Sequence, residues 1–190
     1  MRNLQALGAK STGAGEVQAV RSQGSMGGGL MILLAIDPGN IESAYVVVDK
    51  DYKPLEVAKV ENEQLNKMLP EIIKKHKVKS FAFEMIASYG MAVGAEVFET
   101  CLWIGRFLET VNQTSVASFH KIYRKDEKMV ICGSMRAKDA NIRRALIDRF
   151  AKHDLKNGKG TKKNPDWFYG FKADCWAAFA VAVACREREA

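Results

Sequence analysis

Hydrophobic and polar positions in the first part of the chain predict three short strands. Met31–Asp37 is an almost unbroken apolar run of strand length, and the turn Pro38-Gly39-Asn40 ends it. Ser43–Asp49 is rich in β-branched and aromatic residues, and Leu55–Glu61 alternates between apolar and polar positions. Three strands joined by tight turns predict an antiparallel meander.

Farther along the chain, helical patterns alternate with strand patterns. Apolar residues recur with a helical period from Leu65 to His76; Asn62 is a candidate cap for this helix, and Pro70 indicates a kink. Ser80–Glu84 predicts a short buried strand. The remaining predicted elements are a helix over Ala92–Val111, a strand over Thr114–Phe119, a helix over Arg136–Ala151, a mobile Lys/Gly/Asn loop over His153–Asp166 and an apolar helix over Ala173–Arg188.

The order of these elements, βββαβαβαα, predicts an α/β fold. We expect a mixed five-stranded sheet, with three antiparallel strands followed by strands that alternate with helices, and with helices on both faces. Residues 1–30 are rich in Gly, Ser, Ala and Gln, lack aromatic residues and end near three consecutive glycines. This composition predicts a disordered tail or extension outside a single folded domain over residues 31–190.

Composition and length exclude several classes of protein. The chain has 190 residues, of which 47% are hydrophobic and 27% charged, as is usual for a globular protein. Its longest apolar runs, Leu30–Ile36 and Trp176–Cys185, are shorter than the roughly 20 residues that cross a bilayer, which excludes a transmembrane protein. The four cysteines form no CxxC pair, and no secretory signal pattern is visible, so we expect reduced thiols and a cytoplasmic location.

The positive charge of the chain is concentrated in one segment. Residues 120–172 carry fifteen Lys and Arg against six Asp and Glu, whereas residues 31–119 carry nine against twelve. A lysine-rich segment by itself is usually a solvated surface. Here it follows an acidic half and includes aromatic residues at 167–171, which suits a protein that binds a polyphosphate and performs metal chemistry on it.

Three carboxylates occupy positions that are unusual for acids. Asp37 ends the first strand, Glu84 ends the fourth, and Asp174 opens an otherwise apolar helix. If the first and fourth strands are neighbours, Asp37 and Glu84 project at one edge of the sheet, and Asp174 can reach them from the covering helix. Three converging carboxylates repel one another without a cation, and their hard oxygens suit Mg²⁺ or Mn²⁺.

Each acid also has a purely structural explanation. Asp37 precedes Pro-Gly and could be a turn residue, and Asp174 could stabilise a helix N-terminus. Glu84 has little local use directly after an apolar strand, so the three together favour a metal site.

The motifs that contain these acids resemble a known family. Ala35–Asn40 (AIDPGN), Phe81–Glu84 (FAFE) and Lys172–Ala178 (KADCWAA), in this order, resemble the RuvC-like Holliday-junction resolvases of the ribonuclease-H-like superfamily, and especially their phage-type branch. The resemblance covers about residues 31–188. The DPG turn alone is weakly specific because actin-like ATPases have a similar turn; the ordered trio is far more specific.

The resemblance implies a metal-dependent, structure-selective DNA endonuclease. Such enzymes resolve Holliday junctions and other branched DNA, and leave 5′-phosphate and 3′-hydroxyl ends. Asp37, Glu84 and Asp174 would be the catalytic metal ligands for two Mg²⁺ ions per active site, with Mn²⁺ as a substitute. The ions would bracket the scissile phosphate about 4 Å apart, and Asp37 would bridge them.

One position departs from the family pattern. The cellular enzymes usually have a further acid or His one helical turn before the last Asp, where this sequence has Phe171. The fourth ligand is therefore absent, a water, or a residue of the preceding loop such as Asp166. Asp139 lies in a helix-start pattern, so we give it a structural role.

The resemblance also implies partners. Four-way or branched DNA would be the substrate, held by basic side chains of the segment 121–144, and the two-fold symmetry of a junction favours a homodimer, for which the helix at 92–111 is the expected interface. The aromatic residues at 167–171 would either stack on unpaired bases or, for Phe168 and Phe171, pack in the core. The expected location is the cytoplasm of a bacterium or of a phage-infected host cell. The expected DNA-binding residues are Lys121, Lys128, Arg136, Lys138 and Arg143.

Three other functions compete with this interpretation. The first is a nuclease with a different branched or single-stranded DNA substrate, and the second is a non-catalytic branched-DNA-binding module on the same fold. The third, an actin-like ATPase, requires a second phosphate loop and an adenosine-binding motif that this sequence lacks.

Overall fold

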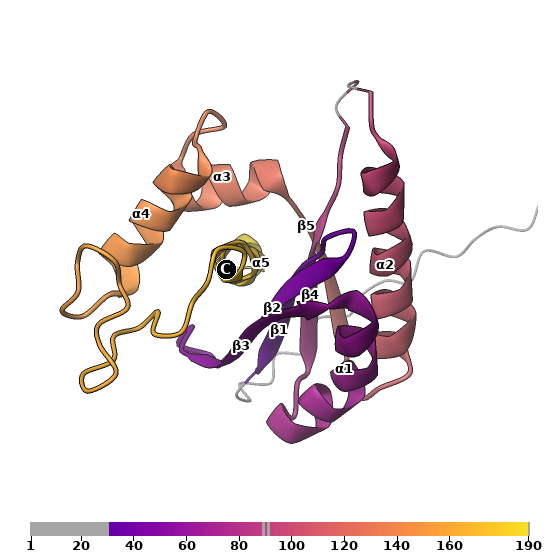
Figure 1. Ribbon diagram of the computed structural model, residues 1–190, viewed down its shortest axis with the longest axis horizontal. Helices are drawn as coiled ribbons and strands as arrows, with labels where there is room; N and C mark the ends of the chain where they lie inside the picture. Colours follow the sequence, from indigo (N-terminus) through magenta and orange to yellow (C-terminus); the bar gives the residue numbers. More distant parts are fainter. Residues whose placement is uncertain (1–30, 89, 91, 190) are drawn as a thin grey trace, which may run out of the picture.

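Five strands form one mixed sheet in the order β3-β2-β1-β4-β5 (Figure 1). The computed structural model describes residues 31–88, 90 and 92–189, so the predicted tail at 1–30 lies outside the described residues. β1, β2 and β3 are mutually antiparallel, whereas β4 runs parallel to β1 and β5 parallel to β4. The strands are β1 (Leu33–Asp37), β2 (Glu42–Val48), β3 (Pro54–Glu61), β4 (Ser80–Met85) and β5 (Ser118–Tyr123).

Helices cover both faces of the sheet, which confirms the predicted fold class. α1 (Asn62–His76) and α2 (Ala95–Asn112) lie on one face, and α5 (Cys175–Glu189) lies on the other. α3 (Arg124–Cys132) and α4 (Asp139–Phe150) form an outer layer beyond α5 (Figure 1). No helix in the described part of the chain is both long and apolar enough to cross a membrane.

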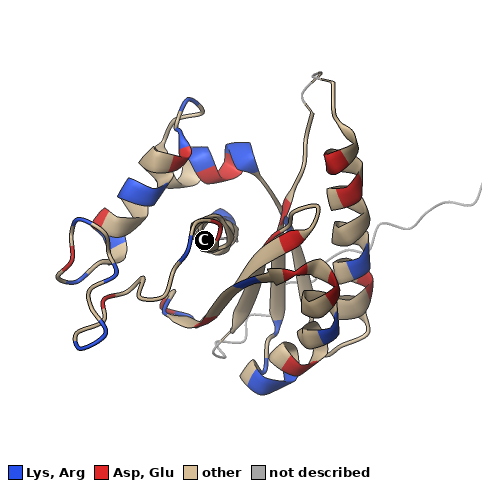
Figure 2. Cartoon of the chain, viewed as in Figure 1, with Lys and Arg blue, Asp and Glu red and all other residues tan. Residues whose placement is uncertain are grey.

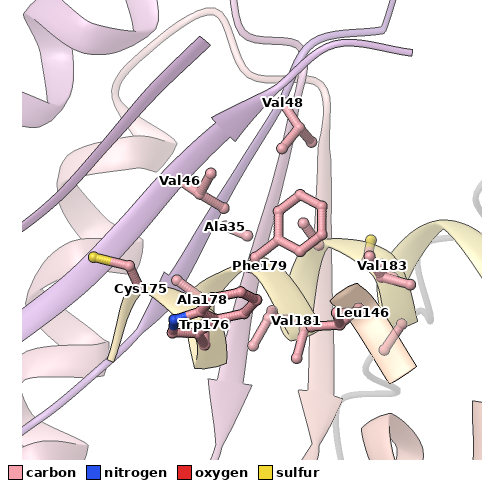
Figure 3. Close-up of a cluster of buried hydrophobic side chains, with 14 of the residues drawn as sticks. Ala35, Val46, Val48, Leu146, Cys175, Trp176, Ala178, Phe179, Val181 and Val183 are labelled. Atoms are coloured by element: carbon pink, nitrogen blue, oxygen red, sulfur yellow. The ribbon is translucent and has the colours of Figure 1, made fainter. Parts of the chain in front are cut away.

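The two faces of the sheet bury different residues because side chains alternate along a strand. Ile36 and Phe83 belong to the core beneath α1 and α2, and the neighbouring Ala35 and Ala82 belong to the core beneath α5. Two alanines leave room for α5 to approach β1 and β4 closely. Phe179 of α5 fills the space beside Ala35, as Figure 3 shows.

The chain before α5 contributes aromatic rings to this core. Phe168 and Phe171 are fully buried, and both meet Phe179 edge-to-face, with ring centroids 5.2 and 5.8 Å away. These two residues are therefore core residues, and base stacking is excluded for them. Trp167 is partly exposed and Tyr169 is exposed.

The turn after β1 is held by a side chain from α1. Asn62 accepts a hydrogen bond from the Ser43 hydroxyl (2.6 Å) and donates one to the Gly39 carbonyl (2.9 Å). Position 39 requires glycine, because a Cβ there would lie 2.3 Å from the carbonyl oxygen of Glu42. Asn62 is the first residue of α1 and does not cap it; instead it fixes the chain directly after Asp37. The helix continues through Pro70.

The structure differs from the sequence prediction between α2 and α4. β5 begins at Ser118, not at Thr114, because Thr114 closes the end of α2: its hydroxyl and its N–H both donate to the Val111 carbonyl. α3 follows β5 directly and was not predicted. Its buried residue is the acidic Glu127, so no apolar period marks this helix in the sequence.

The depth of the core on the α5 side can be tested with two leucines. Leu146 of α4 is fully buried and Leu155 in the following loop is 57% exposed. We expect Leu146→Ala to lower the free energy of unfolding by about 2–5 kcal/mol, through lost burial and a residual cavity. The matched Leu155→Ala should change it by less than about 0.5 kcal/mol. Urea denaturation measures both, and equal losses would contradict this packing.

Candidate active site

Register and side-chain alternation bring Asp37 and Glu84 together. Ile36 pairs with Phe83 across the parallel strands β1 and β4, so the next residues, Asp37 and Glu84, lie side by side at the strand ends. Both side chains fall on the α5 face, because Ala35 and Ala82, two residues earlier, lie beneath α5. The two carboxyls are close enough for the charge of Glu84 to raise the pKa of Asp37. The predicted adjacency of the first and fourth strands is confirmed.

Asp174 reaches the same region from the start of α5. Its carbonyl accepts the N–H groups of Ala177 and Ala178, the first hydrogen bonds of the helix. Its carboxylate, 43% exposed, lies 2.7 Å from the ammonium of Lys59 on β3. Lys59 also lies 3.1 Å from a Glu42 carboxylate oxygen, so one lysine joins two acids from different elements.

These acids line a pocket of about 530 Å³ between the sheet and the outer helices. Asp37 and Glu84 line it at the strand ends, and Asp174 lines it directly before α5. The opposite wall comes from the N-terminal ends of α3 and α4, including Arg124, Asp139 and Arg143.

The carboxyl groups of the pocket are held in unfavourable electrostatic surroundings. Burial, and then the charges of Glu84 and Asp174, raise the pKa of Asp37 to about 8. Burial also raises the pKa of Glu84, although the charge of Arg124 opposes this shift. Asp37 therefore favours its protonated form at neutral pH unless a cation compensates the charge of its carboxylate.

Glu127 is a fourth acid of this region that the sequence reasoning missed. Its side chain is fully buried in α3, and one carboxylate oxygen lies 2.5 Å from an Arg124 guanidinium nitrogen. The other oxygen has no hydrogen-bond partner among the described residues. Burial, followed by the charge of Glu84, raises the pKa of Glu127 to about 9.

Arg124 links the acids of three elements. Besides Glu127, its guanidinium forms an ion pair with Asp139 at the start of α4 and lies 3.9 Å from a Glu84 carboxylate oxygen. A single cation thus offsets part of the negative charge of the pocket. Asp139 is the first residue of α4, the position that its sequence context indicated, and it also lines the pocket.

Asp166, the alternative fourth ligand, is not in the pocket. Its carboxylate accepts backbone N–H groups from Lys152, His153, Asp154 and Trp167. Asp166 lines a different pocket, beside β3, so the structure does not bring this predicted ligand to the other acids. The hydrogen bonds to its carboxylate connect the two ends of the loop after α4.

Four of the five predicted DNA-binding residues lie on the side of the sheet that carries the pocket. Arg143 lines the pocket with its guanidinium 4.7 Å from the centre of the Trp176 ring, and Lys128 is close enough to lower the pKa of Glu84. Arg136 and Lys138 are exposed directly before α4.

Lys121 is the exception among these five residues. It pairs with Phe83 across β4 and β5, whereas the next residue, Ile122, belongs to the core beneath α5. The side chain of Lys121 therefore lies on the α2 face of the sheet, and the structure does not bring it to the pocket.

The oxygen-rich set fits a divalent cation in part. Asp37 and Glu84 offer adjacent carboxylates, and a cation would relieve the repulsion that raises their pKa values. Asp174 fits as a third ligand only after it exchanges Lys59 for the cation. Accordingly, no three His, Cys, Asp or Glu side chains of the described chain already converge as a metal site.

Solved structures that are similar to this chain include Holliday-junction resolvases. RuvC of Thermus thermophilus superposes with a TM-score of 0.62 and 15% identity, over 84% of this chain and 95% of that chain. The same protein in complex with a Holliday junction substrate gives a TM-score of 0.61 and 13% identity, over 84% and 94% of the two chains. The yeast mitochondrial Holliday junction resolvase Ydc2 gives 0.51 and 13%, over 83% and 78%.

No protein-family model and no curated protein sequence matches this chain. At identities of 13–15%, the likeness to solved structures shows the fold. The chain therefore has the RuvC-like form of the ribonuclease-H-like fold, as the three motifs indicated.

The raised pKa of Asp37 gives the stability of the metal-free protein a defined pH dependence. In the folded protein Asp37 keeps its proton up to about pH 8, whereas in the unfolded chain it ionises near its ordinary value of 3.8. Between these values the folded state binds more protons, so the free energy of unfolding falls as pH rises. One group contributes at most about 1.4 kcal/mol per pH unit.

We expect Asp37→Asn to reduce this slope between pH 5 and pH 8 and to stabilise the protein at pH 8. Urea denaturation in the presence of a chelator measures the slope. Asp51→Asn, in an exposed turn, is the control and should keep the wild-type slope. An unchanged slope in Asp37→Asn would show that the carboxyl is not held in repulsive, buried surroundings.

Proposed function

We propose that this protein is a divalent-metal-dependent, structure-selective endonuclease that resolves Holliday junctions and other branched DNA. The observation that carries the proposal is the pair Asp37 and Glu84 at adjacent strand ends, with Asp174 directly before α5, all lining one pocket of about 530 Å³. The fold that presents this pocket is shared with solved Holliday-junction resolvases. The proposal extends to Mg²⁺ as the cation and Mn²⁺ as its substitute.

The three carboxylates would hold the cations. When bound, divalent cations activate a water for in-line attack on phosphorus and stabilise the departing 3′-oxygen, which yields 5′-phosphate and 3′-hydroxyl ends. Glu127 and Asp139 fix the guanidinium of Arg124, and Arg124 in turn orients Glu84. Arg143 lines the same pocket and can contact a phosphate of the DNA backbone.

A non-catalytic branched-DNA-binding module is the second candidate function. One observation favours it: Asp174 is engaged with Lys59 at 2.7 Å, so the three acids are not preassembled around a cation. The two candidates differ in one assay. Labelled four-way, flap and linear DNAs incubated with Mg²⁺ are cut by a nuclease and only bound by a binding module.

We expect Asp37→Asn, Glu84→Gln and Asp174→Asn each to lower the cleavage rate of a four-way junction by about 100-fold or more. The reason is that even outer-shell partners of metal ligands contribute roughly 10–100-fold. Junction binding should persist, because each variant removes negative charge from a phosphate site. Gel-based cleavage at saturating Mg²⁺ and fluorescence anisotropy measure the two properties.

Asp148→Asn is the control for these variants, since Asp148 lies on α4 in an exposed ion pair with Arg144. It should cut at the wild-type rate. If any of the three pocket variants also cuts at the wild-type rate, that residue is not a ligand.

We further propose that the protein acts as a homodimer through α2. A four-way junction has two-fold symmetry and two strands to cut, which matches a two-fold dimer. The outer face of α2 exposes two large apolar side chains, Phe98 (61%) and Leu102 (63%). These residues would be buried against the same face of a second copy.

Leu102→Asp should raise the dimer dissociation constant by about tenfold or more, equivalent to about 1.4 kcal/mol, because it places a charge in an apolar contact. Sedimentation equilibrium measures this constant. The control is Leu155→Asp, which places the same charge at an exposed leucine away from α2. A wild-type protein that stays monomeric at micromolar concentration would contradict the dimer proposal.

A further inference from the structure

The segment between α4 and α5 is the most lysine-rich loop of the structure described above. We call residues 152–172 the basic loop; they contain six lysines and two aspartates, Asp154 and Asp166. The sequence predicted a mobile segment here. In the structure, the two aspartates accept hydrogen bonds from the backbone of this segment.

The carboxylates of both aspartates accept hydrogen bonds from backbone N–H groups of the loop itself. Asp166 accepts four backbone N–H groups at 2.6–2.9 Å. Asp154 accepts the N–H groups of Asn157, Lys159 and Gly160 at 3.0–3.2 Å. Seven hydrogen bonds to two carboxylates therefore define the path of the loop.

The tip of the basic loop is a tight reversal. The N–H of Thr161 donates to the Asn164 carbonyl at 2.9 Å, and Gly160 pairs with Pro165 as a β-bridge. Gly160 has a positive φ of 64°, and a Cβ there would lie 2.3 Å from the carbonyl oxygen of Asn164. This reversal places Lys162 and Lys163 at the exposed tip.

The lysines of the basic loop are left with uncompensated charge. Within residues 31–88, 90 and 92–189, none of the six forms an ion pair with a carboxylate, whereas the two aspartates face the backbone. In Figure 2 the blue segments of the loop continue those of α3 and α4, on the α5 side of the sheet. The active-site pocket lies in the same layer, between α3, α4 and α5.

A groove of about 650 Å³ separates the basic loop from the edge strand β3. It shares no lining residue with the active-site pocket. Its lining combines the lysines Lys53 and Lys152 with the acids Glu56 and Asp166, and Trp167 and Tyr169 add aromatic surface. The two acids offset the two lysines, so the positive charge available to a DNA backbone comes from the exposed lysines of the loop and not from the groove.

α4 sets the distance between this groove and the active site. Asp139 at its first turn lines the active-site pocket, and Phe150 at its end leads into the basic loop. A helix of 12 residues is about 18 Å long, which corresponds to about five base pairs of duplex DNA. A duplex arm that follows α4 away from the pocket thus reaches the loop about half a helical turn later.

We propose that the basic loop is a second DNA-binding element, which grips the backbone of a duplex arm about five base pairs from the scissile phosphate. The proposal rests on the proposed branched-DNA function. Asp154 and Asp166 pre-order the lysines, so the loop loses little conformational entropy on binding. Each phosphate neutralised by a lysine releases counterions, which makes the contribution of the loop salt-dependent.

The first test removes the charge of the loop. Wild type is compared with a variant in which Lys156, Lys159, Lys162 and Lys163 are changed to Gln, by anisotropy with a four-way junction in chelator at several salt concentrations. We expect at least a tenfold loss of affinity, and a log–log salt slope that is smaller by about 2–4.

The matched control loses the same charge on the opposite side of the sheet. It carries Lys67→Gln, Lys74→Gln, Lys77→Gln and Lys79→Gln, all at exposed positions on or next to α1. Its salt slope should stay within about one unit of the wild type.

The second test separates pre-ordering from charge. Asp154→Ala and Asp166→Asn each make the loop one unit more positive, so a purely electrostatic surface would bind DNA equally or more tightly. The proposal expects junction affinity to fall by about threefold or more. Asp166 is buried, so thermal denaturation must show that Asp166→Asn still folds. If it does not fold, the test rests on Asp154→Ala, because Asp154 is only partly buried.

These outcomes distinguish DNA binding by the basic loop from the proposed nuclease function. If the four-lysine variant keeps the wild-type affinity and salt slope, the loop proposal is overturned while the nuclease function stands. An affinity that rises in Asp154→Ala overturns the pre-ordering. If wild-type protein binds no junction at all, the proposed function fails, and the loop proposal fails with it.

Discussion

The close packing of α5 against β1 and β4 is the interaction on which the rest of the structure depends. Ala35 and Ala82 carry the smallest side chains that still bury apolar surface, so the helix can lie directly on the two strands. Side-chain alternation then turns the residues two positions later, Asp37 and Glu84, toward the start of the same helix. The geometry of the pocket is thus a consequence of the core packing two residues earlier on each strand.

This arrangement concentrates negative charge where burial makes it unfavourable. The raised pKa values of Asp37, Glu84 and Glu127 all have burial as their largest cause, followed by one another's charges or the opposing charge of Arg124. The fold tolerates the arrangement because neighbouring elements place cations beside the acids: Arg124 of α3 lies beside Glu84, and Lys59 of β3 lies beside Asp174. Surroundings of this kind are typical of functional sites.

The two sides of the sheet carry different candidate functional surfaces. The α5 side holds the acidic pocket, most of the expected DNA-binding residues and the basic loop, so the proposed chemistry and the proposed DNA contacts lie in one layer (Figure 2). The opposite side presents α2 with its exposed Phe98 and Leu102. A junction on one side and a second copy at α2 are therefore compatible in the same molecule.

Local patterns in the sequence determined most of the fold and three of the acids. The strands around Asp37 and Glu84 and the apolar helix after Asp174 are visible because apolar periods and the Pro-Gly turn are short-range signals. Glu127 and Arg124 were not visible, since a Glu three residues after an Arg looks the same on a solvated helix as on a buried one. The face of β5 that carries Lys121 and the position of Asp166 depended on strand register and on backbone groups distant in the sequence. Only the tertiary structure decided those features, because the elements that pack around a charged group determine its burial and its partners.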